Sequence, residues 1–170
     1  MRMFVRHLLS VAALPFVVVV LVPVWLARTN HVSLAIGPSG PAIFAQIVGL
    51  LLILIGLILF SASLRKFAAD GEGTLAPWDP PTRLVVRGPY RYVRNPMISG
   101  VVFVLLGESL VLLSTPHLWW ALIFLAANAV WIPLVEEAGL RRRFGDSYVE
   151  YCRHVPRLIP GLQPWEPEDR

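Results

Sequence analysis

The stretch Ala42–Ser63, AIFAQIVGLLLILIGLILFSAS, contains no charged residue. A hydrocarbon core of about 30 Å is crossed by about 20 helical residues, so this stretch predicts a transmembrane helix. Three more apolar blocks of comparable length lie at about 8–27, 97–113 and 118–135. We therefore expect a single membrane domain of the all-α class, an integral membrane protein with about four transmembrane helices.

The composition of the chain excludes an ordinary soluble globular protein. Hydrophobic residues make up 56% of the sequence and charged residues 15%, whereas soluble domains average about 45–50% apolar and about 25% charged residues. Basic residues that flank the apolar blocks explain the net charge of +4, and we expect no nucleic-acid partner. The single cysteine, Cys152, cannot form an internal disulfide, and we interpret it as a small half-buried residue.

Basic residues fall almost entirely on one side of the predicted helices. They precede the first block, occupy the link 64–96 and follow the fourth block in the tail 136–170, whereas Arg28 alone lies on the other side. Cytoplasmic segments of membrane proteins are enriched in Lys and Arg. We therefore expect a multi-pass protein with both termini, the link and the tail in the cytoplasm, and we assign it to a bacterial inner membrane.

One cytoplasmic segment is dense in arginine and tyrosine and leads directly into the third block. It reads Gly88-Pro89-Tyr90-Arg91-Tyr92-Val93-Arg94-Asn95-Pro96-Met97. Asn95 suits the N-cap of the following helix, and Pro96 suits its first turn, where a missing N–H costs nothing. On spacing alone, the segment fits a basic aromatic anchor at the membrane interface as well as a functional site.

Two adjacent carboxylates, Glu136 and Glu137, end the fourth block. Negative charge at the C-terminus of a helix opposes the helix dipole, so a cation should compensate it. Nearby arginines, Arg141 included, are one candidate for that cation, and a cationic ligand is the other.

The tail predicts a cytoplasmic amphipathic helix that runs to about Tyr151. Phe144, Tyr148 and Tyr151 recur at helical spacing and line one face of it. We expect this helix to lie against the membrane surface. Farther up the chain, Trp119 and Trp120 predict an aromatic belt at the non-cytoplasmic border.

Several of these pieces follow the order of a known family pattern between about Gly71 and Pro160, which is more than half of the chain. The pieces are Gly88-Pro89-Tyr90, Arg94-Asn95-Pro96-Met97-Ile98-Ser99-Gly100, Glu136-Glu137, Phe144-Gly145-Asp146-Ser147-Tyr148-Val149-Glu150-Tyr151 and Val155-Pro156. The chain thereby resembles the isoprenylcysteine carboxyl methyltransferase and phospholipid methyltransferase superfamily. It departs from the pattern at Asn95 and Ile98, where the family usually has His and Tyr.

The resemblance implies S-adenosylmethionine as cofactor and makes Arg94, Asn95 and Glu137 the candidate catalytic residues. Because an amide is not a base near neutral pH, we expect Asn95 to donate a hydrogen bond to the cofactor. Carboxylates suit the cationic sulfonium and amino groups, and Arg94 suits the cofactor's carboxylate. The candidate cofactor-binding residues are Tyr90, Arg94, Asn95, Pro96, Met97, Gly100, Glu136, Glu137 and Tyr148.

The expected activity is carboxyl O-methylation of an isoprenylcysteine-like group on a lipophilic acceptor that comes from the bilayer. Phospholipid N-methylation, an NADPH-dependent membrane reductase and a non-catalytic membrane scaffold are the alternatives. We expect membrane lipid as a further partner and no metal, because the histidines lack metal-ligand spacing. Glu108, inside the third block, is either a structural protonated residue or part of an acceptor cavity. The oligomeric state is left open.

Overall fold

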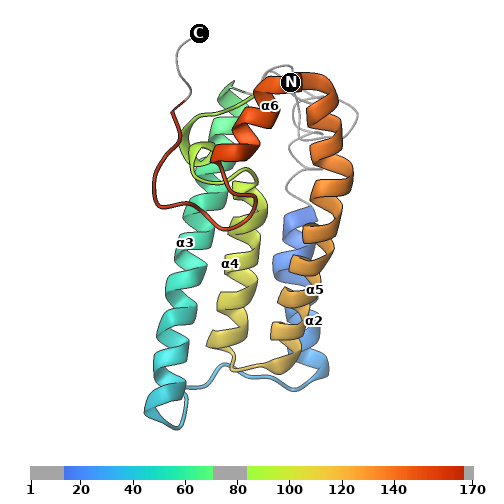
Figure 1. The fold of residues 1–170 in the computed structure, drawn as a ribbon. Coiled ribbons are helices and arrows are strands. Elements are labelled where there is room, and N and C mark those ends of the chain that lie inside the picture. The colour runs from blue at the N-terminus through green and yellow to red at the C-terminus, as the bar shows by residue number, and fades with distance from the viewer. Residues whose placement is uncertain (1–13, 71–83, 167–170) are drawn as a thin grey trace.

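The computed structural model describes residues 14–70 and 84–166, and every regular element in these ranges is helical. In chain order the elements are η1 (Val17–Leu21), α2 (Val22–Thr29), α3 (Gly40–Asp70), η2 (Gly88–Arg91), α4 (Pro96–Val111), α5 (Thr115–Trp131), η3 (Ile132–Glu136) and α6 (Glu137–His154). Figure 1 shows α2, α3, α4 and α5 as a bundle, with α6 folded over the end at which α4 begins. The prediction of an all-α fold is confirmed for the described residues.

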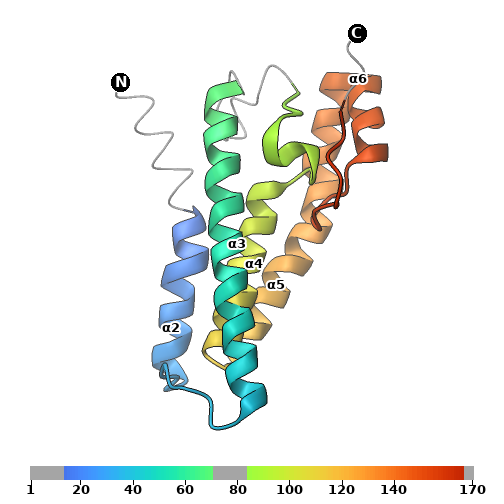
Figure 2. The ribbon, with the colours of Figure 1, turned by 90° about the vertical axis from the view of Figure 1, so that its left-hand side faces the viewer.

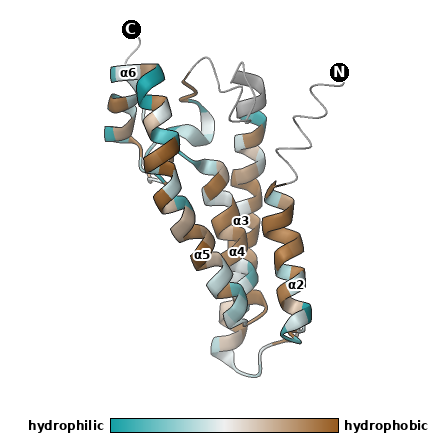
Figure 3. Ribbon diagram, turned by 90° about the vertical axis from the view of Figure 1, so that its right-hand side faces the viewer, coloured by the Kyte–Doolittle hydropathy of each residue, from teal (hydrophilic) through white to brown (hydrophobic). Residues whose placement is uncertain are grey.

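Two helices in the described part of the chain are long and apolar enough to cross a membrane, Gly40–Lys66 and Thr115–His154. Leu14–Thr29 and Pro96–Val111 are shorter apolar helices. Each of the four coincides with a predicted apolar block, although residues 8–13 of the first block lie outside the described residues. Figure 3 shows hydrophobic residues along the bundle and hydrophilic residues gathered around α6.

The cytoplasmic link predicted at 64–96 begins later than expected, because α3 continues to Asp70. Residues 64–70 contain no Gly or Pro that would end a helix. The side chain of Arg65 supports this extension, since its Nε donates to Ser61 O at 3.3 Å. Residues 71–83 of the link lie outside the described residues.

Helices α3 and α4 touch through two pairs of glycines. A Cβ atom added to Gly56 would lie 2.6 Å from Gly100 O, and one added to Gly49 would lie 2.7 Å from Gly107 O. Small residues allow helix backbones to approach this closely. The two pairs fix the position of α4 along α3, and thus the level at which the first turn of α4 begins.

Side chains of α5 tie the first helix to the bundle. Pro23 has no N–H to donate to the preceding turn, and the Trp120 indole Nε1 donates instead to Val18 O at 3.0 Å. His117 is 2% exposed, and its Nε2 lies 3.1 Å from Pro23 O. Trp120 thus bonds within the bundle, whereas Trp119 is 61% exposed. The aromatic belt stays a prediction.

The predicted tail helix is in fact two helices, because the chain reverses at Gly145. This glycine has φ 53° and ψ −131°, a conformation that L-residues rarely adopt. Figure 2 shows α6 rising beyond α5 and then turning back. Tyr148 and Tyr151 are each 2% exposed in a hydrophobic cluster. These rings form the core of a cap made of residues 84–95 and 137–166, and the position of the helix against the membrane stays a prediction.

Candidate functional site

The segment that follows α6 runs alongside the turn that leads into α4. Arg94 N donates to Pro156 O at 2.8 Å, and Asn95 N donates to Arg157 O at 3.2 Å. The Ser99 hydroxyl, in the first turn of α4, bonds to the same segment. These contacts hold the start of α4 and the C-terminal segment together, so that Arg94 and Arg157 face the end of the last apolar helix.

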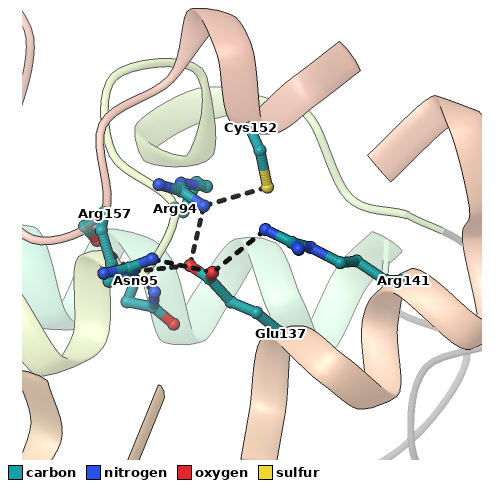
Figure 4. A network of polar contacts seen from close by, with 6 residues as sticks. All are labelled: Arg94, Asn95, Glu137, Arg141, Cys152 and Arg157. Carbon is teal, nitrogen blue, oxygen red and sulfur yellow. Dashed lines mark hydrogen bonds and ion pairs between the residues drawn. The ribbon is translucent and has the colours of Figure 1, made fainter. Parts of the chain in front are cut away.

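Glu137 lies at the centre of this site (Figure 4), and its side chain is 2% exposed. Arg94 Nη1 donates to Glu137 Oε1 at 2.7 Å. Arg157 Nε donates to the same oxygen at 2.7 Å, and its Nη2 donates to Oε2 at 2.9 Å. The guanidinium of Arg141 is farther out, with Nη2 4.0 Å from Oε2. Three guanidinium groups thus surround one carboxylate, which leaves the cluster with a net positive charge.

The arginines decide the ionisation of Glu137. Burial acts to raise the pKa of its carboxyl, but the hydrogen bond from Arg157 and the charges of Arg94, Arg157 and Arg141 outweigh it and lower the pKa below its ordinary value. The bond to Glu137 in turn raises the pKa of Arg157. Of the two cations that could compensate this helix end, the arginines are therefore the ones that hold Glu137.

The three predicted catalytic residues are brought together. Arg94 and Glu137 form an ion pair, and Asn95 precedes the first residue of α4. Asn95 occupies the N-cap position as expected, yet its side chain makes no capping hydrogen bond. Its Nδ2 donates to Arg157 O at 3.4 Å and so links the start of α4 to the C-terminal segment.

The predicted cofactor-binding residues elsewhere in the cap and next to it differ in accessibility. Glu136 is exposed, and its carboxylate has no hydrogen bond or ion pair with any described residue. Tyr90 is half-buried, and its carbonyl accepts a hydrogen bond from the Tyr151 hydroxyl at 2.6 Å. The ring of Tyr148 is enclosed in the cluster of the cap. Glu136 is therefore the open carboxylate, and Tyr148 is the least accessible of these side chains.

The predicted residues at the start of α4 are divided between two roles. Pro96 is buried and Met97 is half-buried at the level of the cluster. Gly100 faces α3 instead, where an added Cβ atom would lie 2.7 Å from Gly56 O. Helix packing accounts for the glycine at position 100.

Two residues of the cluster had no predicted role in the site. Arg157 directly follows the Val155-Pro156 piece of the family pattern, and that position was the signal that could have identified it. Cys152 is half-buried as expected, but its Sγ lies 2.9 Å from Arg94 Nη1. Both residues come from the reversed half of the tail, which a continuous helix would have directed away from Arg94.

Glu108 lies in α4, three turns beyond the cluster. Its Oε2 atom is buried and has no hydrogen-bond partner among the described residues. The Asn128 side chain, near the C-terminal end of α5, donates to Phe124 O at 2.8 Å. Whether Glu108 has a structural role or belongs to an acceptor cavity stays a prediction.

Comparison with known families decides the class of protein. The family model described as phospholipid methyltransferase matches residues 44–147, well over half of the chain. The chain belongs to the phospholipid methyltransferase family. No curated protein and no solved structure matches it. As a phospholipid methyltransferase family member, it is a membrane methyltransferase that uses S-adenosylmethionine, and the family implies a lipid acceptor.

Family membership selects the methyltransferase over the reductase and the scaffold. The residues of the cluster also fit the phospholipid methyltransferase cofactor. Arg94 Nε is buried without a hydrogen-bond partner among the described residues, so it is a donor that a carboxylate would satisfy. The exposed Glu136 is a carboxylate, the kind of group that suits the cationic groups of S-adenosylmethionine.

Proposed function

We propose that the cap binds S-adenosylmethionine around Arg94 and Glu137, and that the methyl acceptor reaches this site from the bilayer. The observation that carries the proposal is the buried ion pair between Arg94 and Glu137, at the end of the apolar bundle in a member of this family. An ion pair that is removed from water is costly to build, which favours a functional reason for its presence.

Each charged side chain has a separate role in this proposal. Glu137 is a positioning residue, because its carboxylate is already bonded to Arg94 and Arg157. Arg94 directs its free Nε to the cofactor's carboxylate, and Glu136 holds the cationic groups. Asn95 donates a hydrogen bond to the cofactor. S-adenosylmethionine supplies an activated methyl group, so alignment by these residues provides most of the rate.

The charge of the cluster favours a carboxylate as the methyl acceptor. Three guanidiniums around one Glu137 carboxylate attract an anionic acceptor. A carboxylate also needs no base, whereas an ammonium group must first lose a proton. Because Asn95 is not a base and Glu137 is occupied, we infer carboxyl O-methylation of an isoprenylcysteine-like lipid. Amine N-methylation is the second candidate, since the free Glu136 carboxylate could accept the amine's proton.

We also propose that all four apolar helices cross the bilayer, with the cap and both termini in the cytoplasm. The basic residues of the cap and the hydrophilic surface of α6 support this orientation (Figure 3). The opposite end of the described bundle carries a single Lys or Arg, Arg28 in the last turn of α2. The assignment to a bacterial inner membrane stays a prediction.

Methyl transfer to defined acceptors tests this function. The purified chain, in lipid nanodiscs, is incubated with methyl-labelled S-adenosylmethionine and either farnesylated cysteine or phosphatidylethanolamine. We expect label on farnesylcysteine that alkali releases as methanol, because esters are base-labile and N-methyl groups are not. Alkali-stable label on phosphatidylethanolamine would establish the second candidate. No transfer to either lipid, by protein that binds the cofactor, would contradict both acceptors.

A further inference from the structure

The C-terminal loop 156–165 exposes two large apolar side chains. Ile159 is 79% exposed and Leu162 is 99% exposed. Figure 1 shows this loop, in dark red, descending from the cap to the level of the first turns of α4. Burial of one such side chain away from water is worth about 1.5–3 kcal/mol, so the two together favour an apolar environment.

The length of α4 indicates what surrounds this loop. Its 16 residues rise about 24 Å, which is less than a hydrocarbon core of about 30 Å. Beside it, the uncharged stretch of α3 runs from Gly56, which packs on Gly100, to Leu64, about one helical turn past the level of Pro96. The hydrocarbon therefore extends about that far beyond Pro96. The loop lies at this level, because Ser99 Oγ donates to Leu158 O at 2.6 Å and Asn95 N donates to Arg157 O at 3.2 Å.

The backbone of the loop suits such a depth. Irregular backbone is tolerated near hydrocarbon only where its polar groups have partners. Three residues of the loop have no N–H to satisfy, namely Pro156, Pro160 and Pro164. Two other N–H groups are bonded to the turn before α4, from Gly161 to Tyr92 O at 2.8 Å and from Trp165 to Arg91 O at 3.0 Å. The bonded polar groups of the loop thus face the turn before α4, whereas the side chains of Ile159 and Leu162 are exposed.

We propose that the loop 156–165 inserts into the cytoplasmic leaflet, with Ile159 and Leu162 among the lipid acyl chains. The occupant is lipid, because the loop lies beside a helix that is itself too short to cover the leaflet. The same loop carries Arg157, whose guanidinium bonds Glu137. Membrane insertion thereby helps to hold that guanidinium at the site. The inference rests on the proposed four-helix topology and does not depend on which acceptor is methylated.

Depth-dependent fluorescence quenching tests the insertion. Leu162→Cys, in a Cys152→Ser background, is labelled with the environment-sensitive dye NBD in vesicles that contain lipids brominated on their acyl chains. Leu162 is fully exposed, so its replacement removes no packing. Two labelled controls share the background: Leu54→Cys on the exposed apolar face of α3, and Ser147→Cys on the exposed surface of the cap.

We expect strong quenching of the dye at positions 162 and 54, and none at position 147. A dye at position 162 that behaves like the one at 147, while position 54 is quenched, would show the loop in water and overturn the inference alone. No quenching at position 54 would overturn the topology on which the inference rests. Blue-shifted emission at position 162 without quenching by brominated lipid would assign the loop to a second copy or another protein, and would also overturn it.

Discussion

Arg94 Nη1 and Glu137 Oε1 lie 2.7 Å apart, although 43 residues separate them in the chain. The pair joins the start of α4 to the start of α6 and lies almost wholly out of water, since the two side chains are 11% and 2% exposed. The sequence led us to expect that these two charged regions meet. Their contact as a buried ion pair gives Glu137 a part in stability as well as in the proposed site.

Replacing Glu137 tests its role as the anchor of the arginines. We expect Glu137→Gln to lower the free energy of unfolding by about 3–5 kcal/mol, because it leaves the nearly buried Arg94 and the partly exposed Arg157 without their charged partner. Thermal unfolding in detergent measures the change. Glu136→Gln is the matched control, and we expect its stability to lie within about 0.5 kcal/mol of the parent protein because residue 136 is exposed. Equal effects of the two substitutions would contradict the assignment.

The stability contribution of Glu137 should depend on pH in a defined direction. Its carboxyl has a pKa below the ordinary 4.5 in the folded protein, so the unfolded chain binds the proton more readily. The contribution is therefore fully present above about pH 4.5 and is lost as the pH falls through the folded-state pKa. We expect the difference in melting temperature between the parent and Glu137→Gln to shrink over that range. A difference that stays constant would mean that the charge of Glu137 contributes nothing.

The reversal at Gly145 predicts an asymmetry between two glycines of α6. An added Cβ atom meets nothing within 4 Å at either Gly145 or Gly139, but only Gly145 has a positive φ, of 53°. Gly145→Ala should therefore cost about 1–3 kcal/mol through backbone strain alone. Gly139→Ala should be neutral or stabilise by about 0.5–1 kcal/mol, because alanine favours a helix. Both are measured by thermal unfolding, and similar values for the two would argue against the reversal.

The contact between α3 and α4 predicts that Gly56 tolerates no side chain. An added Cβ atom would lie 2.6 Å from the backbone oxygen of Gly100, which cannot move without displacing α4. We expect Gly56→Ala to lower stability by about 1–3 kcal/mol through overpacking. Gly40→Ala, where an added Cβ atom meets nothing within 4 Å, should leave stability unchanged. A destabilised Gly40→Ala together with a tolerated Gly56→Ala would place the helix contact elsewhere.

Helix positions could be predicted from the sequence because they depend on local composition. The predicted block 97–113 differs from α4 by one or two residues at each end. The agreement is close because Pro96 and the apolar stretch that follows it mark where the helix begins and ends. The continuation of α3 to Asp70 was missed because polar residues continue a helix as readily as they begin a loop.

The site was only partly predictable, because its geometry depends on contacts that are distant in sequence. The family pattern singled out Arg94 and Glu137 as residues of one site. Arg157 and Cys152 were missed because they reach the cluster only through the reversal at Gly145. A glycine with a positive φ cannot be distinguished in sequence from an ordinary helical glycine such as Gly139.

Hydrogen–deuterium exchange with S-adenosylhomocysteine tests most directly whether the cofactor is held where Arg94 meets Glu137. Exchange is measured for the parent chain in lipid nanodiscs with and without the ligand, and again for Glu136→Gln. The variant should bind S-adenosylhomocysteine about tenfold to a hundredfold more weakly, because it loses one charge-assisted contact. We predict ligand-dependent protection of residues 90–97 and 136–157. Saturable binding that protects only other parts of the chain would contradict the proposed site. Binding that is equally tight in Glu136→Gln and leaves both of these segments unprotected would contradict it as well.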